Sequence, residues 1–216
     1  MHEDCIYKGN CDDECKNLCI RYSEMKYLLS KSNLPKSQQC IHRLEPESCD
    51  IRAFEQLADI QENIEEFVKN GNNLYLFSRQ VGNGKTTWMV KLLLQYFHEI
   101  NYGNCHKERG LFINVPTYLM QAKNAISSPS EEVENLKDLM MKVDLVIFDD
   151  ITAVKLSNYD YSTLLGYIDS RLFNGKSMFF TGNYEKEKLS DILGDRLASR
   201  VCSGTVIELF GKDRRK

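Results

Sequence analysis

One stretch decides the fold of this chain: Leu74-Tyr75-Leu76-Phe77-Ser78-Arg79-Gln80-Val81-Gly82-Asn83-Gly84-Lys85-Thr86-Thr87. Its apolar start predicts a buried strand, and two glycines then form a turn before a helical pattern begins at Lys85. Glycines let the backbone approach an anion, and the N–H groups at the start of a helix point toward it. Lys85 is expected to reach the β- and γ-phosphates of a nucleotide, and the Thr86 hydroxyl to bind Mg²⁺. We therefore predict a phosphate-binding loop made of Gly82, Asn83, Gly84, Lys85, Thr86 and Thr87.

The loop departs from the common pattern G-x-x-x-x-G-K-[ST] at its first position, where Arg79 replaces glycine. A residue with a side chain must then make the turn from strand to loop. The sequence therefore leaves the shape of the loop and its affinity for nucleotide open.

Short apolar segments and helical patterns alternate on both sides of the loop. Asp50 is predicted to cap one amphipathic helix over residues 51–68, which Asn70 and Gly71 end. The alternation is typical of an α/β protein with a parallel five-stranded sheet flanked by helices. Because few residues follow the last predicted strand, we expect no C-terminal lid. Strands are expected at residues 74–78, 111–115, 145–149, 177–181 and 205–210, and helices near residues 85–100, 116–142, 158–173 and 186–203.

Composition restricts the class of protein. The chain has 216 residues, a net charge of −3 and 42% hydrophobic residues. No apolar run approaches the roughly 20 residues that cross a bilayer, and the polar N-terminus differs from a signal peptide. We therefore expect a cytoplasmic protein without a membrane partner. Its balanced charge argues against strong DNA binding by a single copy.

Two regions differ in their content of cysteine. Residues 1–49 hold six of the eight cysteines, whereas residues 50–216 carry the alternating pattern of strands and helices. We predict a small Cys-rich helical region over residues 1–49 and an α/β domain over residues 50–216.

The first four cysteines are a candidate metal site. Five, three and three residues separate Cys5, Cys11, Cys15 and Cys19, which is not the spacing of a paired C-x-x-C zinc knuckle. On a regular helix Cys11 and Cys19 would lie about 12 Å apart, whereas sulfurs on one zinc ion lie about 4 Å apart. Either the segment unwinds, or one pair of thiols joins Cys5 and a distant ligand such as Cys40, Cys49, His2 or His42. Zinc, an iron–sulfur cluster and inert buried thiols all remain open.

Two carboxylates end the apolar run Val143-Asp144-Leu145-Val146-Ile147-Phe148-Asp149-Asp150. Ligands of open parallel sheets bind at the carboxyl ends of the strands, so Asp149 and Asp150 are expected to face the phosphate loop. We assign Asp149 to Mg²⁺ and Asp150 to orienting the attacking water. The alternative is a loop turn with two solvated acids.

Polar residues after the strand at 177–181 and in the helical segment near 186–203 complete the predicted site. Asn183 follows the strand at 177–181 and could hold the attacking water or contact the γ-phosphate, although Gly182-Asn183 is also an ordinary turn signal. Arg196 and Arg200 lie one helical turn apart. Arginine can neutralise charge that develops during phosphoryl transfer, in its own chain or in a neighbour, but both side chains could also be merely solvated.

The chain resembles the DnaC/DnaI-type AAA+ helicase loaders through motifs that occur in the same order. The similarity is greatest to the short versions found in phages and prophages of Gram-positive bacteria, and it covers about residues 50–216. The cysteine-bearing N-terminal region is similar more loosely. The motifs are Gly-Asn-Gly-Lys-Thr (82–86), Val-Ile-Phe-Asp-Asp-Ile (146–151), Thr-Gly-Asn (181–183), Leu-Gly-Asp-Arg-Leu-Ala-Ser-Arg (193–200) and Gly-Lys-Asp-Arg-Arg (211–215).

The resemblance implies a role for each motif. Lys85 and Thr86 would hold Mg-ATP, Asp149 and Asp150 would form the Walker B pair, and Asn183 would be sensor one. Arg200 would be an arginine finger that reaches the ATP of a neighbouring subunit. Arg215 matches the sensor-two arginine best, with Arg214 as the second choice.

The resemblance also implies the activity and its partners. We expect an AAA+ ATPase of a bacterial or phage-infected cytoplasm, with slow hydrolysis that DNA or a partner stimulates. It would assemble as a homo-oligomer, bind single-stranded DNA and deliver a replicative hexameric helicase, which its N-terminal region would grip. Residues 116–142 would face the DNA, although Lys123 is one of few basic residues there.

Three other functions remain open from the sequence. An IstB-like transposition ATPase would act with a transposase instead of a helicase. A nucleotide-locked interaction module would bind ATP or ADP with little hydrolysis, which Arg79 and Asp150 make plausible. A small-molecule kinase would share the loop but need an acceptor site.

Overall fold

A computed structural model describes Cys5 and residues 19–39, 44–101 and 104–214 of the protein. Its centre is one parallel sheet in the order β2-β3-β4-β1-β5, so that β4 separates the first strand from the third. All five predicted strands are present, with ends that differ by no more than two residues from those predicted. The strands are β1 (Leu74–Phe77), β2 (Gly110–Asn114), β3 (Leu145–Asp149), β4 (Ser177–Gly182) and β5 (Thr205–Glu208).

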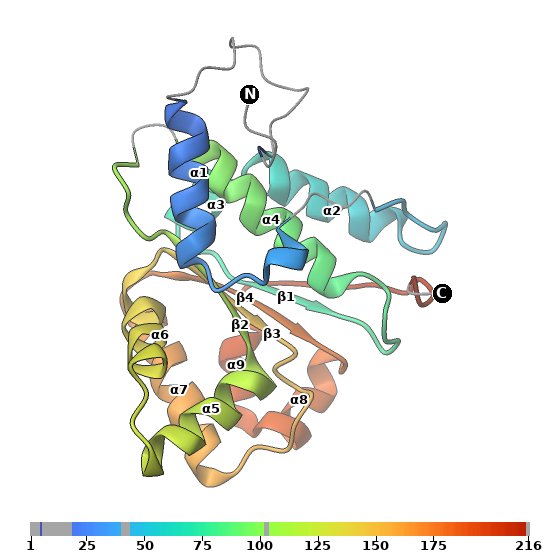
Figure 1. Ribbon diagram of the computed structural model, residues 1–216. Helices are drawn as coiled ribbons and strands as arrows, with labels where there is room; N and C mark the ends of the chain where they lie inside the picture. The colour runs from blue at the N-terminus through green and yellow to red at the C-terminus, as the bar shows by residue number, and fades with distance from the viewer. Residues whose placement is uncertain (1–4, 6–18, 40–43, 102–103, 215–216) are drawn as a thin grey trace.

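Helices cover both faces of the sheet, as the alternating sequence predicts (Figure 1). The first face packs against α1 (Ile20–Lys31), α2 (Ile51–Glu62), α3 (Ile64–Lys69) and α4 (Lys85–Ile100). The second face packs against α5 (Val115–Ser127), α6 (Glu131–Lys142), α7 (Asn158–Phe173), α8 (Lys186–Leu193) and α9 (Asp195–Val201). A short 3-10 turn, η1 (Lys36–Gln38), follows α1. In the described part of the chain no helix is both long and apolar enough to cross a membrane.

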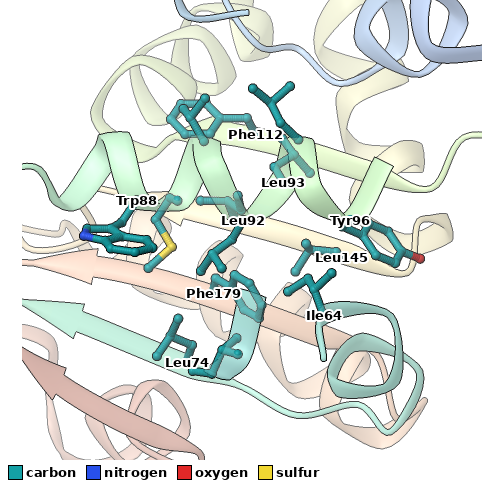
Figure 2. Packing of buried hydrophobic residues seen from close by; sticks show 14 of the residues in the cluster. Ile64, Leu74, Trp88, Leu92, Leu93, Tyr96, Phe112, Leu145 and Phe179 are labelled. Carbon is teal, nitrogen blue, oxygen red and sulfur yellow. The ribbon is translucent and has the colours of Figure 1, made fainter. Parts of the chain in front are cut away.

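Each strand divides its side chains between two apolar clusters. In β1, Leu74 and Leu76 pack into the cluster below α4, whereas Tyr75 and Phe77 pack into the cluster of the opposite face. Figure 2 shows the first cluster, in which Trp88 and Leu92 of α4 lie over Leu74 and Phe179 of the sheet. Because both faces are covered, the strands read as continuous apolar runs in the sequence.

Three predicted helices are each two helices. The helix expected over residues 51–68 breaks at Asn63, between α2 and α3. The segment 116–142 breaks before Ser130, whose side chain accepts a hydrogen bond from the N–H of Val133 and starts α6. The segment 186–203 breaks at Gly194, where φ is +78° and continued helix is excluded. Apolar periodicity continues through all three breaks, so it does not reveal them.

The prediction that Asp50 caps the following helix is wrong. Its side chain makes no capping hydrogen bond, although the residue stands at the start of α2. Instead the carboxylate accepts hydrogen bonds from the backbone N–H groups of Phe210 (2.7 Å) and Gly211 (3.0 Å), at the far end of the chain. Local sequence could not show this competing partner.

The segment that precedes residue 50 contributes to the same core. Met25, Leu28 and Leu34 belong to the cluster below α4, and the N–H of Phe112 in β2 donates to the carbonyl of Ser32 (2.7 Å). Residues 20–34 therefore cover the β2 edge of the sheet. The boundary at residues 49 and 50 and the binding role of the preceding region stay predictions.

Candidate nucleotide-binding site

A cavity of about 440 Å³ lies at the carboxyl ends of the strands, where the sequence predicts the phosphate site. Eight of its lining residues were predicted as site residues, and the tail residue Arg214 was the second choice for sensor two. Leu44, Val81 and Ala153 were not predicted. The lining consists of Leu44, Val81, Gly82, Asn83, Gly84, Lys85, Thr86, Thr87, Asp150, Ala153, Asn183 and Arg214.

The loop adopts backbone angles that require glycine at two positions. Gly82 has φ +75° and Gly84 has φ +101°, and α4 begins directly after Gly84. A Cβ on Gly82 would lie 1.9 Å from Oδ1 of Asp213, so a larger residue would have to displace that side chain. Lys85 is buried, and its Nζ donates to the carbonyl of Gln80 (3.2 Å) across the loop. The first three residues of α4, Lys85, Thr86 and Thr87, line the cavity together with the loop.

The substitution of Arg79 for the first loop glycine causes no backbone strain. Arg79 does not have a positive φ angle, so its position does not depend on glycine. Its exposed side chain lies outside the cavity, where it forms ion pairs with Glu185 and Glu208. The arginine is thus anchored at the outer side of the loop, and its side chain does not line the cavity.

The first acid of the predicted pair faces the loop. Asp149 ends β3 with 3% of its surface exposed, and its carboxylate accepts hydrogen bonds from Oγ1 of Thr86 (3.0 Å) and of Thr181 (2.7 Å). Burial raises the pKa of Asp149 to about 6, while these two hydroxyl groups oppose the rise. The alternative of a solvated turn acid does not hold for Asp149. A hydroxyl and a carboxylate side by side are suitable ligands for a hard divalent cation.

Thr181 connects the two acids, and the sequence analysis missed its role. The fully buried hydroxyl donates to Asp149 and accepts the backbone N–H of Asp150 (2.8 Å). Asp150 has φ +58°, a left-handed conformation that this hydrogen bond helps to hold, and its side chain lines the cavity. The sequence held one signal for Thr181, since it is a polar residue at the carboxyl end of an apolar strand.

The remaining predicted site residues divide into two groups. Asn183 lines the cavity, and its backbone N–H donates to Oγ1 of Thr152 (2.9 Å). Arg200 does not line the cavity of its own chain, because its Nε donates to Asp169 of α7 (2.7 Å). Arg196 contacts the same carboxylate at 3.3 Å, so the two arginines share one face as their spacing predicts.

Among the described residues of the C-terminal segment, Arg214 lines the cavity. Arg215, the first choice for sensor two, lies outside the described residues. Arg214 lines the cavity together with Leu44, and a Cβ on Gly84 would lie 3.5 Å from Leu44 and 3.7 Å from Arg214. No local motif marks Leu44, because only the folded chain brings it to the loop.

Two of the four cysteines of the predicted metal site, Cys11 and Cys15, lie outside the described residues. Cys5 and Cys19 are both half-buried, and Cys5 packs against the cluster below α4. Within the described ranges, no three His, Cys, Asp or Glu side chains form a group that could hold a metal ion. Zinc binding by the four cysteines stays a prediction.

Three features together define a P-loop ATPase of the AAA+ type. They are a glycine loop after β1, an acid at the end of β3, and polar residues at the end of β4, the strand that lies between β3 and β1. The family model of the bacterial DnaA ATPase domain matches residues 52–208, and the chain belongs to this family. A search among curated proteins finds no match to the chain.

Several solved structures have the same fold. One is the DnaC helicase loader, with a TM-score of 0.65 and 16% identity over 77% of this chain and 93% of that chain. A protein described as a primosome component of Streptococcus pyogenes serotype M3 has a TM-score of 0.65 and 24% identity, covering 88% of this chain and 98% of that chain. The replication initiator DnaA bound to AMPPCP and single-stranded DNA has a TM-score of 0.59 and 17% identity, covering 77% of this chain and 48% of that chain.

Proposed function

We propose that this chain is an ATP-dependent loader that places a replicative hexameric DNA helicase on single-stranded DNA. One observation carries the proposal: the loop and the acid that would hold Mg-ATP lie together in a fold shared with a helicase loader. Hydrolysis would reset the binding of partners and yield no metabolite. The slow turnover expected from the sequence fits such a switch.

The residues of the cavity suit Mg-ATP. Thr86 and Asp149 would hold Mg²⁺ directly or through its water shell, and the ion would neutralise phosphate charge. Lys85 would bind the β- and γ-phosphates, while Asp150 and Asn183, which also line the cavity, would orient the attacking water. Arg214 would contact the phosphates from the C-terminal segment, in the sensor-two role.

Arg200 would act on the nucleotide of a neighbouring copy. It lies outside the cavity of its own chain, and 30% of its side chain is exposed on α9. This placement supports a homo-oligomer in which one copy completes the site of the next. The DnaA structure that contains AMPPCP also contains single-stranded DNA, which supports the same pair of ligands here. Lys123 is a poor DNA contact, because its Nζ binds the buried Asp160 (2.8 Å).

A capture experiment tests the loader function. The purified full chain serves as bait with Mg-AMPPCP, with ADP or without nucleotide, and the prey is the replicative helicase or a transposase of the same cell. We expect the helicase to be retained in a nucleotide-dependent manner and single-stranded DNA to stimulate ATP hydrolysis. Retention of the transposase alone would favour an IstB-like helper. Tight nucleotide binding without turnover under all conditions would favour a locked interaction module.

The charge of Asp149 is expected to destabilise the ligand-free protein. Its pKa is raised from 3.8 to about 6, so the folded state disfavours the ionised carboxylate above that pH. Asp149→Asn should raise the free energy of unfolding at pH 7.5 by about 3 kcal/mol, which is the energy of a pKa rise of roughly two units for a buried group. Near pH 4 the gain should vanish, because Asp149 is then protonated in the folded protein. Urea unfolding at both pH values measures the difference.

The same variant should lose ATP hydrolysis, because the amide is a poorer Mg²⁺ ligand. Asp138→Asn, at an exposed position of α6, is the matched control and should change neither property. If the Asp149→Asn protein were less stable than the wild type at pH 7.5, the buried carboxylate of Asp149 would not destabilise the ligand-free protein, and the prediction would be wrong.

A further inference from the structure

Two segments from opposite ends of the domain meet beside the phosphate loop. Residues 44–50 precede α2, and residues 209–214 follow β5. Besides the two hydrogen bonds to Asp50, the N–H of Lys212 donates to Glu47 (3.0 Å) and Nη1 of Arg214 donates to the carbonyl of Glu45 (2.6 Å). The contact between the segments is thus continuous over their length.

Asp50 is the centre of this contact. It has no exposed surface, and both of its carboxylate oxygens accept backbone N–H groups of the C-terminal segment. The fit is close, because a Cβ on Gly211 would lie 2.3 Å from Oδ2 of Asp50. A buried carboxylate is costly unless it is paired, so its partners are fixed in place.

The C-terminal segment is in turn attached to the phosphate loop. The backbone N–H of Arg214 donates to the carbonyl of Gly82 (2.9 Å), and Nδ2 of Asn83 donates to the carbonyl of Leu209 (3.2 Å). The backbone of Arg214 is therefore anchored to the loop, while its segment is held by Asp50 on the other side.

The guanidinium of Arg214 is held at the edge of the cavity by three groups. Its Cζ lies 5.5 Å from the centre of the Phe54 ring, Nη1 binds Glu45, and Nη2 lies 3.8 Å from Oδ2 of Asp50. Its Nε and Nη2 are buried, and neither has a hydrogen-bond partner among the described residues. Buried donors without acceptors at the edge of a cavity are suited to an anionic ligand.

The geometry points to Asp50 as a positioning residue for the nucleotide. It holds the C-terminal segment by two backbone hydrogen bonds and faces the guanidinium of Arg214, which it keeps directed at the phosphates. Asp50 lies outside the cavity lining and acts on the nucleotide only through this segment. This inference rests on the proposed binding of Mg-nucleotide.

Calorimetric titration of the full chain with Mg-AMPPCP tests the inference. Asp50→Asn keeps the size of the side chain but removes its charge and places an NH₂ group against a backbone N–H. We expect the Kd to rise about tenfold, and a similar rise for Arg214→Gln. The double variant should bind about as weakly as Arg214→Gln alone, because Asp50 acts through Arg214. The matched control is Asp59→Asn, which changes an exposed residue of α2, the helix that follows Asp50. It should leave the Kd unchanged.

The outcomes separate this inference from the proposed function. Absence of Mg-AMPPCP binding by the wild type would refute nucleotide binding itself. Normal binding by Asp50→Asn, or losses that multiply in the double variant, would refute the positioning role alone. If Asp50→Asn does not fold, Gly211→Ala moves the same segment without removing the buried charge, and its Kd should rise by about threefold or more. An unchanged Kd in Gly211→Ala would then refute the role.

Discussion

Replacement of Lys85 by alanine is expected to abolish ATP hydrolysis while the fold is kept. Lys85 begins α4 at the cavity, and its Nζ is buried across the loop from Gln80. Within the protein the ammonium group would be the main positive charge at the β- and γ-phosphates, so its loss should lower the hydrolysis rate roughly 100-fold or more. The ligand-free protein should unfold at an unchanged or higher temperature, because a buried charge has been removed.

Steady-state phosphate release and thermal unfolding of the purified variant measure both effects. Lys69→Ala is the control, since that lysine is exposed at the end of α3 on a different part of the surface. Hydrolysis at the wild-type rate in Lys85→Ala would mean that residues 82–87 do not bind the phosphates of the substrate. The proposed function would then lose its chemical basis.

Replacement of Arg200 by alanine is expected to lower hydrolysis by roughly 1000-fold, the effect of losing an arginine finger. The cause differs from that in Lys85→Ala, because Arg200 would act on the nucleotide of a neighbouring copy. Nucleotide binding by the isolated variant should therefore stay near that of the wild type. Arg196→Ala is the matched control, since Arg196 contacts the same Asp169 from the same helix face.

A mixture of the two inactive variants tests the action between copies. Lys85→Ala retains the finger, and Arg200→Ala retains an intact phosphate site, so mixed assemblies should recover part of the hydrolysis. Normal hydrolysis by Arg200→Ala alone would show that the finger assignment is wrong. A mixture that stays inactive, although the copies associate, would place the role of Arg200 within its own chain.

The parts of the site that depend on local order could be predicted from the sequence. The glycine loop, Lys85 and Thr86 are consecutive, and their pattern follows from how a helix start binds an anion. Asp149 and Asn183 could be predicted because each follows an apolar strand, and parallel strands end at the same edge of the sheet. Their roles in catalysis stay predictions.

The helix breaks and the Asp50 contact could not be predicted in this way. Apolar periodicity continues across Asn63 and Gly194, because both neighbouring helices face the same core. Asp50 precedes a helix, as capping residues do, but its carboxylate gains two N–H donors from residues about 160 positions away.

The sequence by itself determined the alternating architecture, the phosphate loop and the positions of the acids, since these follow from short-range patterns of polarity and backbone freedom. Only the tertiary structure decided which side chains meet. Thr181 joins two acids from the neighbouring strand, Leu44 and Arg214 close one side of the cavity, and the guanidinium of Arg171 is fully buried among four carbonyl groups. Such contacts depend on how distant segments pack, because a buried polar group takes whichever partner the folded chain brings to it.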